Sequence, residues 1–392
     1  DFITGFHHRN KMPYTFFIQR ICILSSILPL YELLIIFLLY FCSGKSDDME
    51  KTNIRAYTLQ ELANVLVQHG EKAFRAKQIW QWLWQKGVTR FEDMTNLSKE
   101  FRVFLDNHFT LQAATLTHKQ ESSDGTTKLG FTLPDGNLIE TVLIPSKDKS
   151  TVCVSSQVGC KLKCSFCATG GLGFTRNLLP EEIFDQVVAV KRLGDERGLP
   201  LSNIVLMGMG EPLLNYENVL TAIEHITAED GLGMSPYRLT LSTSGIVEGI
   251  KRLADDDVRF NLAISLHSAV NTTRDKIMPI NKAYPLTELA EAIRYFVDKT
   301  GTRPTFEYLL LKGVNDSLDD AKALALFCRQ FPVKINIIEY NEVDNAPYRH
   351  SPDASRDQFV RYLESKNIVV NIRRSKGKDI DAACGQLANK NS

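Results

Sequence analysis

The stretch Thr151-Val-Cys-Val-Ser-Ser-Gln-Val-Gly-Cys-Lys-Leu-Lys-Cys-Ser-Phe-Cys167 joins a strand-like run to three closely spaced cysteines, Cys160, Cys164 and Cys167. An iron–sulfur cube held by protein alone takes four thiolates. Three thiolates would therefore leave one iron open to a small molecule, and an open position distinguishes a reactive metal centre from a closed structural one. The spacing predicts a reactive iron–sulfur site at the end of a strand.

Two simpler interpretations of these cysteines have to be weighed. Eight cysteines in 392 residues are too sparse for a disulfide scaffold, and a chain of this length can build a core without one. Zinc remains an alternative, because three thiolates and any one distant ligand would complete its tetrahedral shell.

Composition sets few limits on function. Hydrophobic residues at 44% and charged residues at 23% are ordinary values for a globular protein. Lys plus Arg and Asp plus Glu both number 46, so the net charge of zero predicts no highly charged partner. A nucleic-acid site would have to be a local basic patch.

The first 48 residues differ in character from the remainder of the chain. Ile21–Cys42 is apolar and long enough to cross a bilayer, but Pro29 and Glu32 lie near its middle, where a carboxylate is costly. Globular patterning begins after Met49. We therefore expect residues 1–48 to be an upstream translated extension, with a signal anchor as the alternative.

Residues 49–110 are expected to form a small helical domain. A capping box at Thr58 starts one helix, and further helices are predicted over Phe74–Lys86 and Ser98–His108. Trp82 falls outside the apolar stripe of its helix. A surface that combines this ring with the basic residues of the domain could bind RNA phosphates and stack a base, although a plain solvated face is the commoner interpretation. The basic residues of this domain are Lys72, Arg75, Lys77, Lys86 and Arg90.

Strand patterns follow the helical domain. Residues 111–145 alternate with a period of two and contain turn signals at 123–125 and 134–136, which predicts a short antiparallel β element. From residue 146 to 376, strand and helix patterns alternate, and such units predict an α/β fold with a parallel sheet and helices outside it. The first strand, Thr151–Val158, leads to the cysteines. The other predicted strands are 203–207, 238–242, 261–266, 305–311, 334–338 and 368–372, and the helices are 180–193, 216–226, 247–254, 286–299, 318–330 and 356–365.

Reactive groups of parallel sheets gather at the carboxyl ends of the strands. The second strand ends in Gly208-Met-Gly-Glu-Pro212, where the glycines would let a ligand approach the backbone and Glu211 could accept a charge-assisted hydrogen bond. Later strand ends offer Ser242-Thr-Ser-Gly245, Ser265-Leu-His267 and Glu339-Tyr-Asn341. Taken one by one, such groups more often serve as caps or turns.

Two further cysteines stand outside the triplet. Cys153 lies within the first strand, and Cys384 lies in Asp379-Ile-Asp-Ala-Ala-Cys-Gly-Gln-Leu387, a segment with little core character that is expected to be exposed. A single cysteine is usually a small buried hydrophobe. Cys328 fits that interpretation, because it falls in a helical pattern.

Together these motifs resemble the RlmN/Cfr family of radical S-adenosylmethionine (SAM) RNA methyltransferases. The resemblance extends from about Met49 to Ala388. It implies a partial (βα)6 radical-SAM barrel over residues 146–376, followed by a C-terminal segment, 377–392, that carries a methyl-accepting cysteine. The shared motifs are Cys153–Cys160 with the cysteine triplet, Gly208–Pro212, Leu241–Gly245, Ser265–His267 and Asp379–Leu387.

The resemblance also implies a role for each site residue. The cysteine triplet would hold a 4Fe–4S cluster whose open iron binds SAM, and two SAM molecules would be used per turnover. Cys384 would carry the methyl group, Cys153 would release the product by forming a disulfide with it, and Glu140 would transfer a proton. The positions that match SAM-binding residues of the family are Gly210, Glu211, Ser242, Ser265, Leu266, His267 and Asn341.

The implied reaction is methylation of carbon 2 of adenine in 23S rRNA and in tRNA. That carbon is electron-poor and will not attack SAM directly, so a carbon radical has to be delivered to it. Rival hypotheses are a Cfr-type enzyme acting on carbon 8 of the same rRNA adenine, a radical SAM enzyme for a small metabolite, and a zinc-dependent RNA-binding protein. The family's chemistry implies an external one-electron donor resembling flavodoxin, a reducing cytoplasmic setting and no stable membrane partner. The oligomeric state is not predicted.

Overall fold

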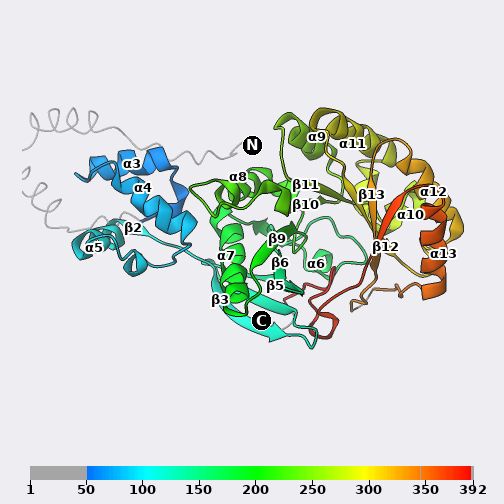
Figure 1. The fold of residues 1–392 in the computed structure, drawn as a ribbon, viewed down its shortest axis with the longest axis horizontal. Coiled ribbons are helices and arrows are strands. Elements are labelled where there is room, and N and C mark those ends of the chain that lie inside the picture. Colours follow the sequence, from blue (N-terminus) through cyan, green and yellow to red (C-terminus); the bar gives the residue numbers. More distant parts are fainter. Residues whose placement is uncertain (1–50, 345, 390–392) are drawn as a thin grey trace, which may run out of the picture. The chain divides into compact units, whose positions relative to one another are not determined.

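The computed structural model describes residues 51–344 and 346–389 (Figure 1). The chain divides into two compact units, 1–52 and 53–392, and only residues 51 and 52 of the first are described. The apolar segment Ile21–Cys42, and with it the expected extension or signal anchor, lies outside the described residues. Within the described part of the chain, no helix has both the length and the apolar character that a membrane crossing requires.

Among the described residues, ten strands form one mixed sheet, in the order β14-β13-β12-β11-β10-β9-β6-β5-β4-β3. Its antiparallel part is β3 (Thr115–Glu121), β4 (Thr127–Thr132) and β5 (Leu138–Ser146), joined by the predicted turns. β5 also pairs with β6 (Lys149–Cys153), the first parallel strand, so the predicted antiparallel element is continuous with the parallel sheet. The parallel strands after β6 are β9 (Leu201–Leu206), β10 (Leu239–Thr243), β11 (Asn261–Ser265), β12 (Thr305–Leu310), β13 (Lys334–Glu339) and β14 (Val369–Arg373).

Each parallel strand is connected to the next by helices that lie outside the sheet (Figure 1). The outermost strands of the sheet, β14 and β3, lie at opposite ends of the strand order, so the sheet does not close into a complete barrel. The α/β class and the strand–helix alternation of a partial barrel are therefore confirmed. α10 was not predicted, because one short helix carries little periodicity. The connecting helices are α7 (Pro180–Glu196), α8 (Tyr216–Thr227), α9 (Val247–Asp255), α10 (Asn271–Ile277), α11 (Leu286–Thr300), α12 (Leu318–Cys328) and α13 (Asp353–Glu364).

The predicted strand Thr151–Val158 is wrong in its second half. It ends at Cys153 in β6, and β7 (Gln157–Gly159) pairs instead with β8 (Phe174–Asn177) in a separate two-stranded sheet. The break comes at Ser155, whose backbone amide donates to the Gln186 side chain at 2.8 Å. The chain therefore leaves the main sheet before it reaches the three cysteines. The other short elements of this half are α6 (Ala168–Gly171), η4 (Pro212–Asn215), η5 (Pro236–Arg238), η6 (Pro279–Lys282) and η7 (Lys378–Ile380).

The predicted helical domain begins as its sequence indicates. Helix α3 (Leu59–Gln68) starts at the capping box of Thr58, whose side chain accepts a hydrogen bond from the Glu61 amide. Helix α5 (Lys99–His108) starts at Ser98, which caps it in the same way. The short elements of this region are β1 (Thr52–Asn53), η1 (Ile54–Ala56), η3 (Phe91–Asp93) and β2 (Phe109–Thr110).

The predicted helix over Phe74–Lys86 is only partly right. α4 (Arg75–Trp80) gives way to a wider π-helical turn, η2 (Gln81–Gln85). A π-helical turn contains an additional residue and so rotates the side chains that follow it. The consecutive residues Leu83 and Trp84 are both buried in this turn. The apolar period that predicted one regular helix is therefore interrupted where Leu83 and Trp84 enter the core.

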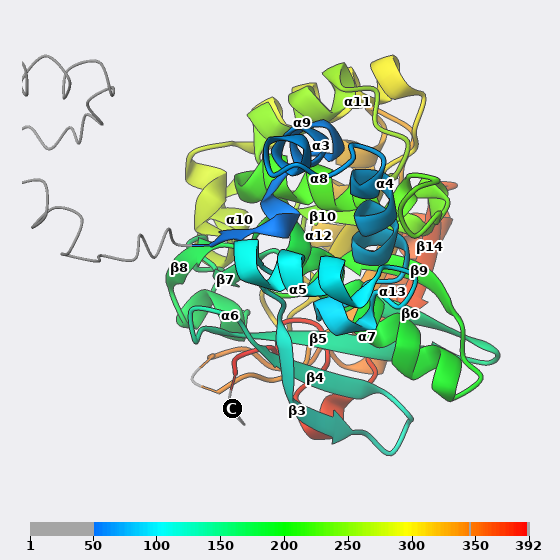
Figure 2. The same ribbon diagram turned by 90° about the vertical axis from the view of Figure 1, so that its left-hand side faces the viewer.

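Two buried contacts fix these helices to the barrel. The ring of Trp84 stacks on His225 of α8, with 3.7 Å between ring centroids and 9° between planes. Arg55 Nη1 lies 2.6 Å from Asp185 Oδ1 of α7, and both side chains are almost fully buried. Figure 2 shows α3 and α4 in front of α8 on this side of the molecule. The helical domain and the barrel therefore share one core.

Candidate active site

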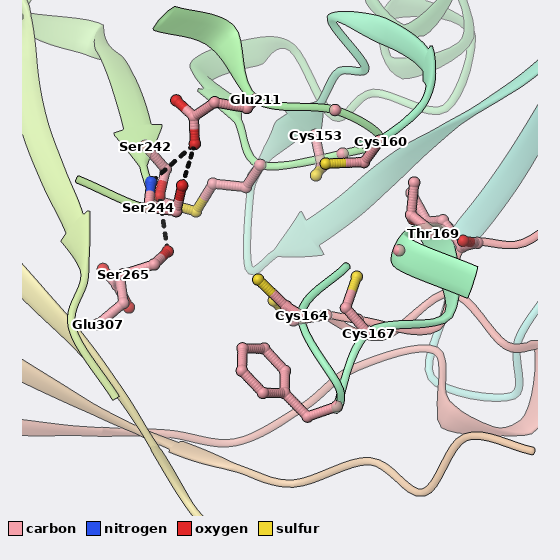
Figure 3. Close-up of a pocket in the computed structure, with 18 of the residues that line it drawn as sticks. Cys153, Cys160, Cys164, Cys167, Thr169, Glu211, Ser242, Ser244, Ser265 and Glu307 are labelled. Atoms are coloured by element: carbon pink, nitrogen blue, oxygen red, sulfur yellow. Dashed lines mark hydrogen bonds between the residues drawn. The ribbon is translucent and has the colours of Figure 1, made fainter. Parts of the chain in front are cut away.

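The carboxyl ends of the parallel strands surround an open cavity whose empty space amounts to about 1230 Å³. Figure 3 shows side chains of the cysteine triplet and Cys153 pointing into the hollow that Ser242 and Ser265 also face. The predicted site residues that line the cavity are Cys153, Cys160, Cys164, Cys167, Gly210, Glu211, Ser242, Ser265, His267 and Cys384. The structure therefore brings most of the predicted site together, although these residues come from distant parts of the sequence.

Backbone contacts hold the loop that carries the cysteine triplet. Gly159 precedes it with φ of +72°, and a Cβ atom there would lie 1.9 Å from the carbonyl oxygen of Gly173. Only glycine fits such a position. The Cys160 amide donates to the same oxygen at 2.7 Å, and the Ser165 amide donates to the carbonyl of Ile277 at 3.0 Å. The loop is thus tied both to β8 and to the end of α10.

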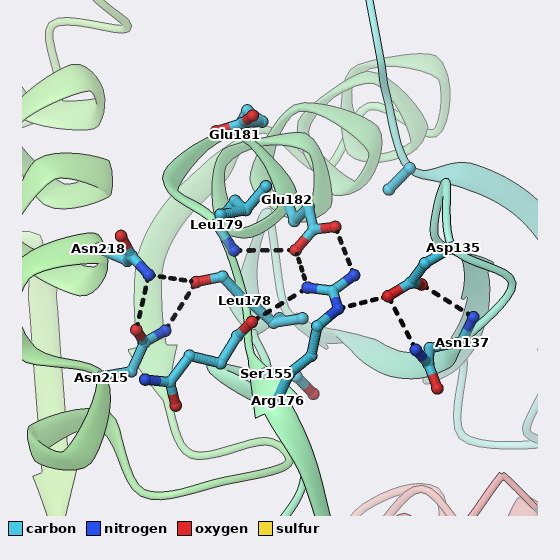
Figure 4. A network of polar contacts seen from close by, with 12 residues as sticks. Asp135, Asn137, Ser155, Arg176, Leu178, Leu179, Glu181, Glu182, Asn215 and Asn218 are labelled. Atoms are coloured by element: carbon cyan, nitrogen blue, oxygen red, sulfur yellow. Dashed lines mark hydrogen bonds and ion pairs between the residues drawn. The ribbon is translucent and has the colours of Figure 1, made fainter. Parts of the chain in front are cut away.

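Arg176 fastens β8, which follows the cysteine loop, to the rest of the fold (Figure 4). Its guanidinium donates two hydrogen bonds of 2.8 Å to Glu182 in the first turn of α7. Its Nε contacts Asp135 in the turn between β4 and β5. This contact holds the pKa of Asp135 well below its ordinary value. A two-pronged guanidinium–carboxylate pair of this kind fixes geometry as well as charge, so Arg176 stabilises the support of the cysteine loop.

The three thiols line one cavity and have the chemistry that a cluster needs. Burial raises the pKa of Cys160 to about 11 and also raises that of Cys164, and metal binding would remove these protons. Among the described residues, no three His, Cys, Asp or Glu side chains converge as a single-ion site requires. In an iron–sulfur cube each thiolate binds a different iron, so the ligands stand apart. The ligand type that the triplet offers therefore fits an iron–sulfur cluster.

Glu211 is buried in the cavity wall and is already hydrogen-bonded. Its Oε2 accepts from the amide and the hydroxyl of Ser244 at 2.7 Å each, and its Oε1 accepts from the Leu213 amide at 3.1 Å. Burial raises the pKa of this carboxyl group. Oε2 has both of its acceptor sites occupied, so a ligand ammonium group would have to bind at Oε1, which accepts from the Leu213 amide.

The glycines before Glu211 serve the packing of the protein itself. A Cβ atom at Gly208 would lie 2.7 Å from the backbone of Val154, and one at Gly210, where φ is +101°, would lie 2.5 Å from Gln157 Cβ. The sequence suggested that these glycines admit a ligand. Their first effect is to let the segment after β9 pack against the connection between β6 and β7.

Two strand ends form the opposite wall. Ser242 of β10 and Ser265 of β11 have hydroxyl oxygens 3.4 Å apart. His267 follows in the left-handed region with φ of 55°, and its Nδ1 accepts from the Leu309 amide at 3.1 Å. Burial lowers the pKa of His267 to about 3, so the ring is neutral near pH 7. With Nδ1 as an acceptor, the ring proton is assigned to Nε2.

Two predicted SAM-binding residues lie behind the cavity lining. Leu266 is fully buried, and its carbonyl oxygen accepts from Arg274. Asn341 is also buried, and its Nδ2 donates to the carbonyl of Cys384 at 3.3 Å. Among the described residues, nothing donates to the buried Oδ1 of Asn341. An unpaired buried acceptor is costly, so Asn341 fits a ligand that brings a donor, such as the amino group of adenine.

Cys153 and Cys384 reach the cavity as free thiols from β6 and from the C-terminal segment. Cys384 keeps the expected solvent contact because it faces the cavity, but burial by the surrounding walls raises its pKa to about 12. Burial likewise raises the pKa of Cys153 to about 12. Both thiols are therefore protonated near pH 7. Cys328 is buried in α12, as expected of a core cysteine.

Glu140 does not line the cavity. Its Oε1 lies 3.1 Å from Lys128 Nζ, and its Oε2 accepts from the amides of Ala388 and Asn389 at 2.8 and 3.1 Å. Both oxygens are thus engaged by the protein. The structure does not bring Glu140 into the group formed by the cysteines, and its role as a base stays a prediction.

Two polar cavity residues, Thr169 and Glu307, were missed by the sequence analysis. Ser244 also lines the cavity and belongs to the strand end Ser242–Gly245 that the sequence analysis named. Thr169 donates to the carbonyl of Leu387 at 2.7 Å and so holds the segment that carries Cys384. Burial raises the pKa of Glu307. Nothing local marks Thr169 or Glu307, because each stands in an ordinary helix or strand pattern.

Comparison with known proteins gives matches over almost the whole chain. Residues 52–111 match the ribosomal RNA large subunit methyltransferase N-terminal domain, and residues 154–325 match the radical SAM superfamily. A Cytophaga hutchinsonii protein described as a probable dual-specificity RNA methyltransferase RlmN is 51% identical over 356 residues, which cover 90% of this chain and 98% of that protein. The dual-specificity RNA methyltransferase RlmN of Geotalea uraniireducens is 46% identical over 339 residues, which cover 86% of this chain and 97% of that protein.

A solved structure agrees with these relatives. The crystal structure of a radical SAM methyltransferase from Sphaerobacter thermophilus superposes with a TM-score of 0.82 at 41% identity, and the match covers 86% of this chain and 99% of that one. Sequence identity and shared structure therefore extend over both the helical domain and the barrel. The superfamily match includes the cysteine triplet. On these grounds the chain belongs to the RlmN family of dual-specificity RNA methyltransferases, within the radical SAM superfamily.

Proposed function

We propose that this protein transfers a methyl group from SAM to carbon 2 of adenine in 23S rRNA and in tRNA, with Cys384 as the methyl carrier. One observation supports the proposal above the others: the free thiols of Cys384 and Cys153 line the same cavity as the cysteine triplet. A closed structural metal site would not need two additional thiols beside it. Membership of the RlmN family favours carbon 2 over carbon 8.

The cavity residues fit the two groups that radical SAM chemistry requires. The cysteine triplet would hold a 4Fe–4S cluster, while Glu211 and the serine pair would bind SAM. Asn341, behind the lining, would contribute its unpaired oxygen. When bound, the cluster supplies the electron that cleaves SAM and so provides a radical that abstracts hydrogen. Two SAM molecules are consumed, one as the methyl donor and one as the radical source.

The remaining steps are carried out by the protein's own side chains. The Cys384 thiolate displaces the methyl group of one SAM, so that a carbon–sulfur bond forms at Cys384 as the one in SAM breaks. After loss of a hydrogen atom, the methylene radical on that sulfur adds to carbon 2 of the adenine, and the adduct would give up one electron to the oxidised cluster and the proton of carbon 2 to a base. The Cys153 thiolate then attacks the Cys384 sulfur, so that a disulfide forms as the bond from that sulfur to the methylene carbon breaks, and this carbon takes up a proton to become the methyl group. Glu140 would accept the proton from carbon 2.

We assign RNA contact to the helical domain. Lys72, before α4, and Lys77, within it, are exposed, and Phe74 between them has 59% of its surface exposed. Two other basic residues of the domain are engaged in ion pairs, Arg75 with a neighbouring glutamate and Arg90 with an aspartate. Cations next to an exposed aromatic ring suit a phosphate and an unstacked base.

We propose a different aromatic residue for base stacking from the one that the sequence suggested. Trp82, the residue that its sequence position suggested, is half-buried, and its ring nitrogen donates to the side chain of Asn96. Phe74, in contrast, has most of its side chain exposed to solvent. We therefore propose Phe74 for this role.

The proposal includes partners that the fold does not identify. An external one-electron donor of the flavodoxin type would reduce the cluster, because no residue of the chain can supply a low-potential electron. A reducing cytoplasmic setting would suit the free thiols and an oxygen-sensitive cluster.

Nucleoside analysis of reacted RNA tests the proposal. Anaerobically reconstituted protein, SAM, a reductant and unmodified 23S rRNA or tRNA should yield 2-methyladenosine by mass spectrometry. Formation of 8-methyladenosine would instead support a Cfr-type enzyme. A colourless zinc protein that produces no 5′-deoxyadenosine would support the RNA-binding alternative and contradict the proposal.

Substitution of single cysteines separates their roles. Cys384→Ala should abolish methylation, and Cys153→Ala should trap protein crosslinked to RNA. The matched control is Cys328→Ala, because this thiol is also free but lies buried in α12. It should methylate RNA as the unmodified protein does. Free, normally methylated RNA from Cys153→Ala would refute the release role.

A further inference from the structure

Arg274 is a fully buried arginine behind the wall of the cavity, in α10. Its Nε donates to the carbonyl of Leu266 at 3.0 Å, and its Nη2 donates to the carbonyls of Ser244 at 2.7 Å and Ser265 at 3.4 Å. Its Nη1 donates to Asn281 Oδ1 at 2.9 Å. One side chain therefore holds the backbone at the ends of both β10 and β11.

These hydrogen bonds continue to the residue expected to bind SAM. Ser244, whose carbonyl accepts from Arg274, donates both its amide and its hydroxyl to Glu211 Oε2 at 2.7 Å. Figure 3 shows Glu211, Ser244 and Ser265 together on this wall. A planar guanidinium is pre-organised for several acceptors at once. The position of the wall therefore depends on Arg274, although Arg274 does not line the cavity.

The charge of Arg274 lacks a carboxylate among its hydrogen-bond partners. All four acceptors are neutral, three backbone carbonyls and one side-chain amide. The adjacent Asp275 accepts from Asn281 at 2.7 Å. A buried charge is costly unless an opposite charge compensates it. On the cavity side, α10 is joined to the cysteine loop, because the amide of Ser165, next to Cys164, donates to the carbonyl of Ile277 at 3.0 Å. Arg274 and Cys164 also interact electrostatically.

We propose that Arg274 is a positioning residue for the SAM-binding wall and the buried counter-cation of the thiolate cluster. The inference rests on the proposed binding of that cluster by the cysteine triplet. Three thiolates give the cluster a net negative charge, which a fixed guanidinium behind Cys164 offsets. Each added electron makes the cluster more negative, so the guanidinium favours its reduced form and raises its reduction potential.

The test uses anaerobically reconstituted protein and three variants. Arg274→Gln removes the charge and some of the hydrogen bonds that the guanidinium donates. Arg274→Lys keeps the charge but makes fewer hydrogen bonds. Asp275→Asn removes a nearby negative charge while keeping an acceptor for Asn281. The measurements are iron and sulfide content, the midpoint potential followed by electron paramagnetic resonance, and the change in that spectrum when SAM is added.

The expected shifts differ in sign. Arg274→Gln should lower the midpoint potential, Asp275→Asn should raise it, and Arg274→Lys should leave it near that of the unmodified protein. Both Arg274 variants should need more SAM to reach half of the spectral change, because the wall is less firmly held. A residue with only a structural role would reduce cluster loading without moving the potential of the clusters that form.

Each contrary outcome has one meaning. Loaded Arg274→Gln protein with an unchanged potential overturns the inference while the proposed function stands. If Arg274→Gln does not fold, an unchanged potential in Asp275→Asn overturns it equally. If the unmodified protein binds no iron and sulfide, the proposed function fails, and the inference fails with it.

Discussion

Lys128 and Glu140 form a buried ion pair between β4 and β5, with 3.1 Å between Nζ and Oε1. The second oxygen of Glu140 accepts from the amides of Ala388 and Asn389. The pair therefore joins the antiparallel strands to the segment that carries Cys384. Oε2 of Glu140 can therefore take a proton from a substrate only after these amides leave.

The double variant Lys128→Met, Glu140→Gln tests whether this pair holds the end of the chain. It replaces both charges by neutral groups of similar size, a change that usually costs little stability. A hydrogen bond to a charged group contributes about 1.5 kcal/mol or more, so the Ala388 and Asn389 amides should exchange with solvent about tenfold faster. Hydrogen–deuterium exchange followed by mass spectrometry measures this. Lys119→Met, at a half-exposed ion pair of β3, is the control and should leave that exchange unchanged.

A second buried ion pair, Arg55 with Asp185, should dominate the attachment of the helical domain. Asp185→Asn leaves the Arg55 charge buried without its partner, which should lower the free energy of unfolding by about 3 kcal/mol. Urea denaturation measures the change. Asp195→Asn is the matched control, because this residue of the same helix pairs with Lys191 at the surface, at 47% exposure of both side chains. That variant should lose less than about 1 kcal/mol. Equal losses in the two variants would contradict the assignment.

Much of the fold was predictable because the signals are local. The capping box at Thr58 and the apolar parallel strands depend on residues close together in the sequence. The prediction failed at Ser155, because the amide of that residue bonds to the side chain of Gln186 in α7. No local pattern reveals that a distant side chain will compete with a neighbouring strand for this amide.

The domain boundaries at 110, 145 and 376 stay predictions.

The residues of the candidate site also divide into those that the sequence could predict and those that it could not. The cysteine triplet could be singled out from its spacing, since its three thiols lie within one loop, although that spacing left zinc as an alternative. Lys128 and Arg274 could not, because neither stands in a motif and each has its effect through backbone groups or side chains from other strands. Burial of a charged residue is the signal that finds them, and it exists only in the folded protein.

Gly159 should be indispensable for the cysteine loop. An added Cβ atom would overlap the carbonyl oxygen of Gly173, at 1.9 Å, in a backbone region that favours glycine. Gly159→Ala should therefore displace Cys160 and lower the iron bound per protein after reconstitution by at least about half, since a cluster needs its thiolates in place. Gly171→Ala is the control, because a Cβ atom there meets nothing within 4 Å. Full iron loading of Gly159→Ala would contradict this reading of the loop.

The reactivity of Cys384 should depend steeply on pH. Burial raises its pKa to about 12, whereas an exposed thiol ionises near about 8.5. The thiolate is the nucleophile, so alkylation of Cys384 by iodoacetamide should accelerate about tenfold per pH unit from neutral to pH 11 without levelling off. Mass spectrometry of the Cys384 peptide from protein without bound metal gives the rate.

The same shift carries a stability prediction with a definite sign. Between pH 8.5 and 12, the folded protein holds thiol protons at Cys384 and Cys153 that the unfolded chain has already lost, so folding weakens as the pH rises through this window. Protein without bound metal should therefore unfold at lower urea concentration at pH 10 than at pH 7. Cys384→Ala should reduce that difference, because it removes one of the titrating groups. An alkylation rate that levels off near pH 8.5, as in the urea-unfolded chain, would show that the walls of the cavity do not enclose Cys384 in solution.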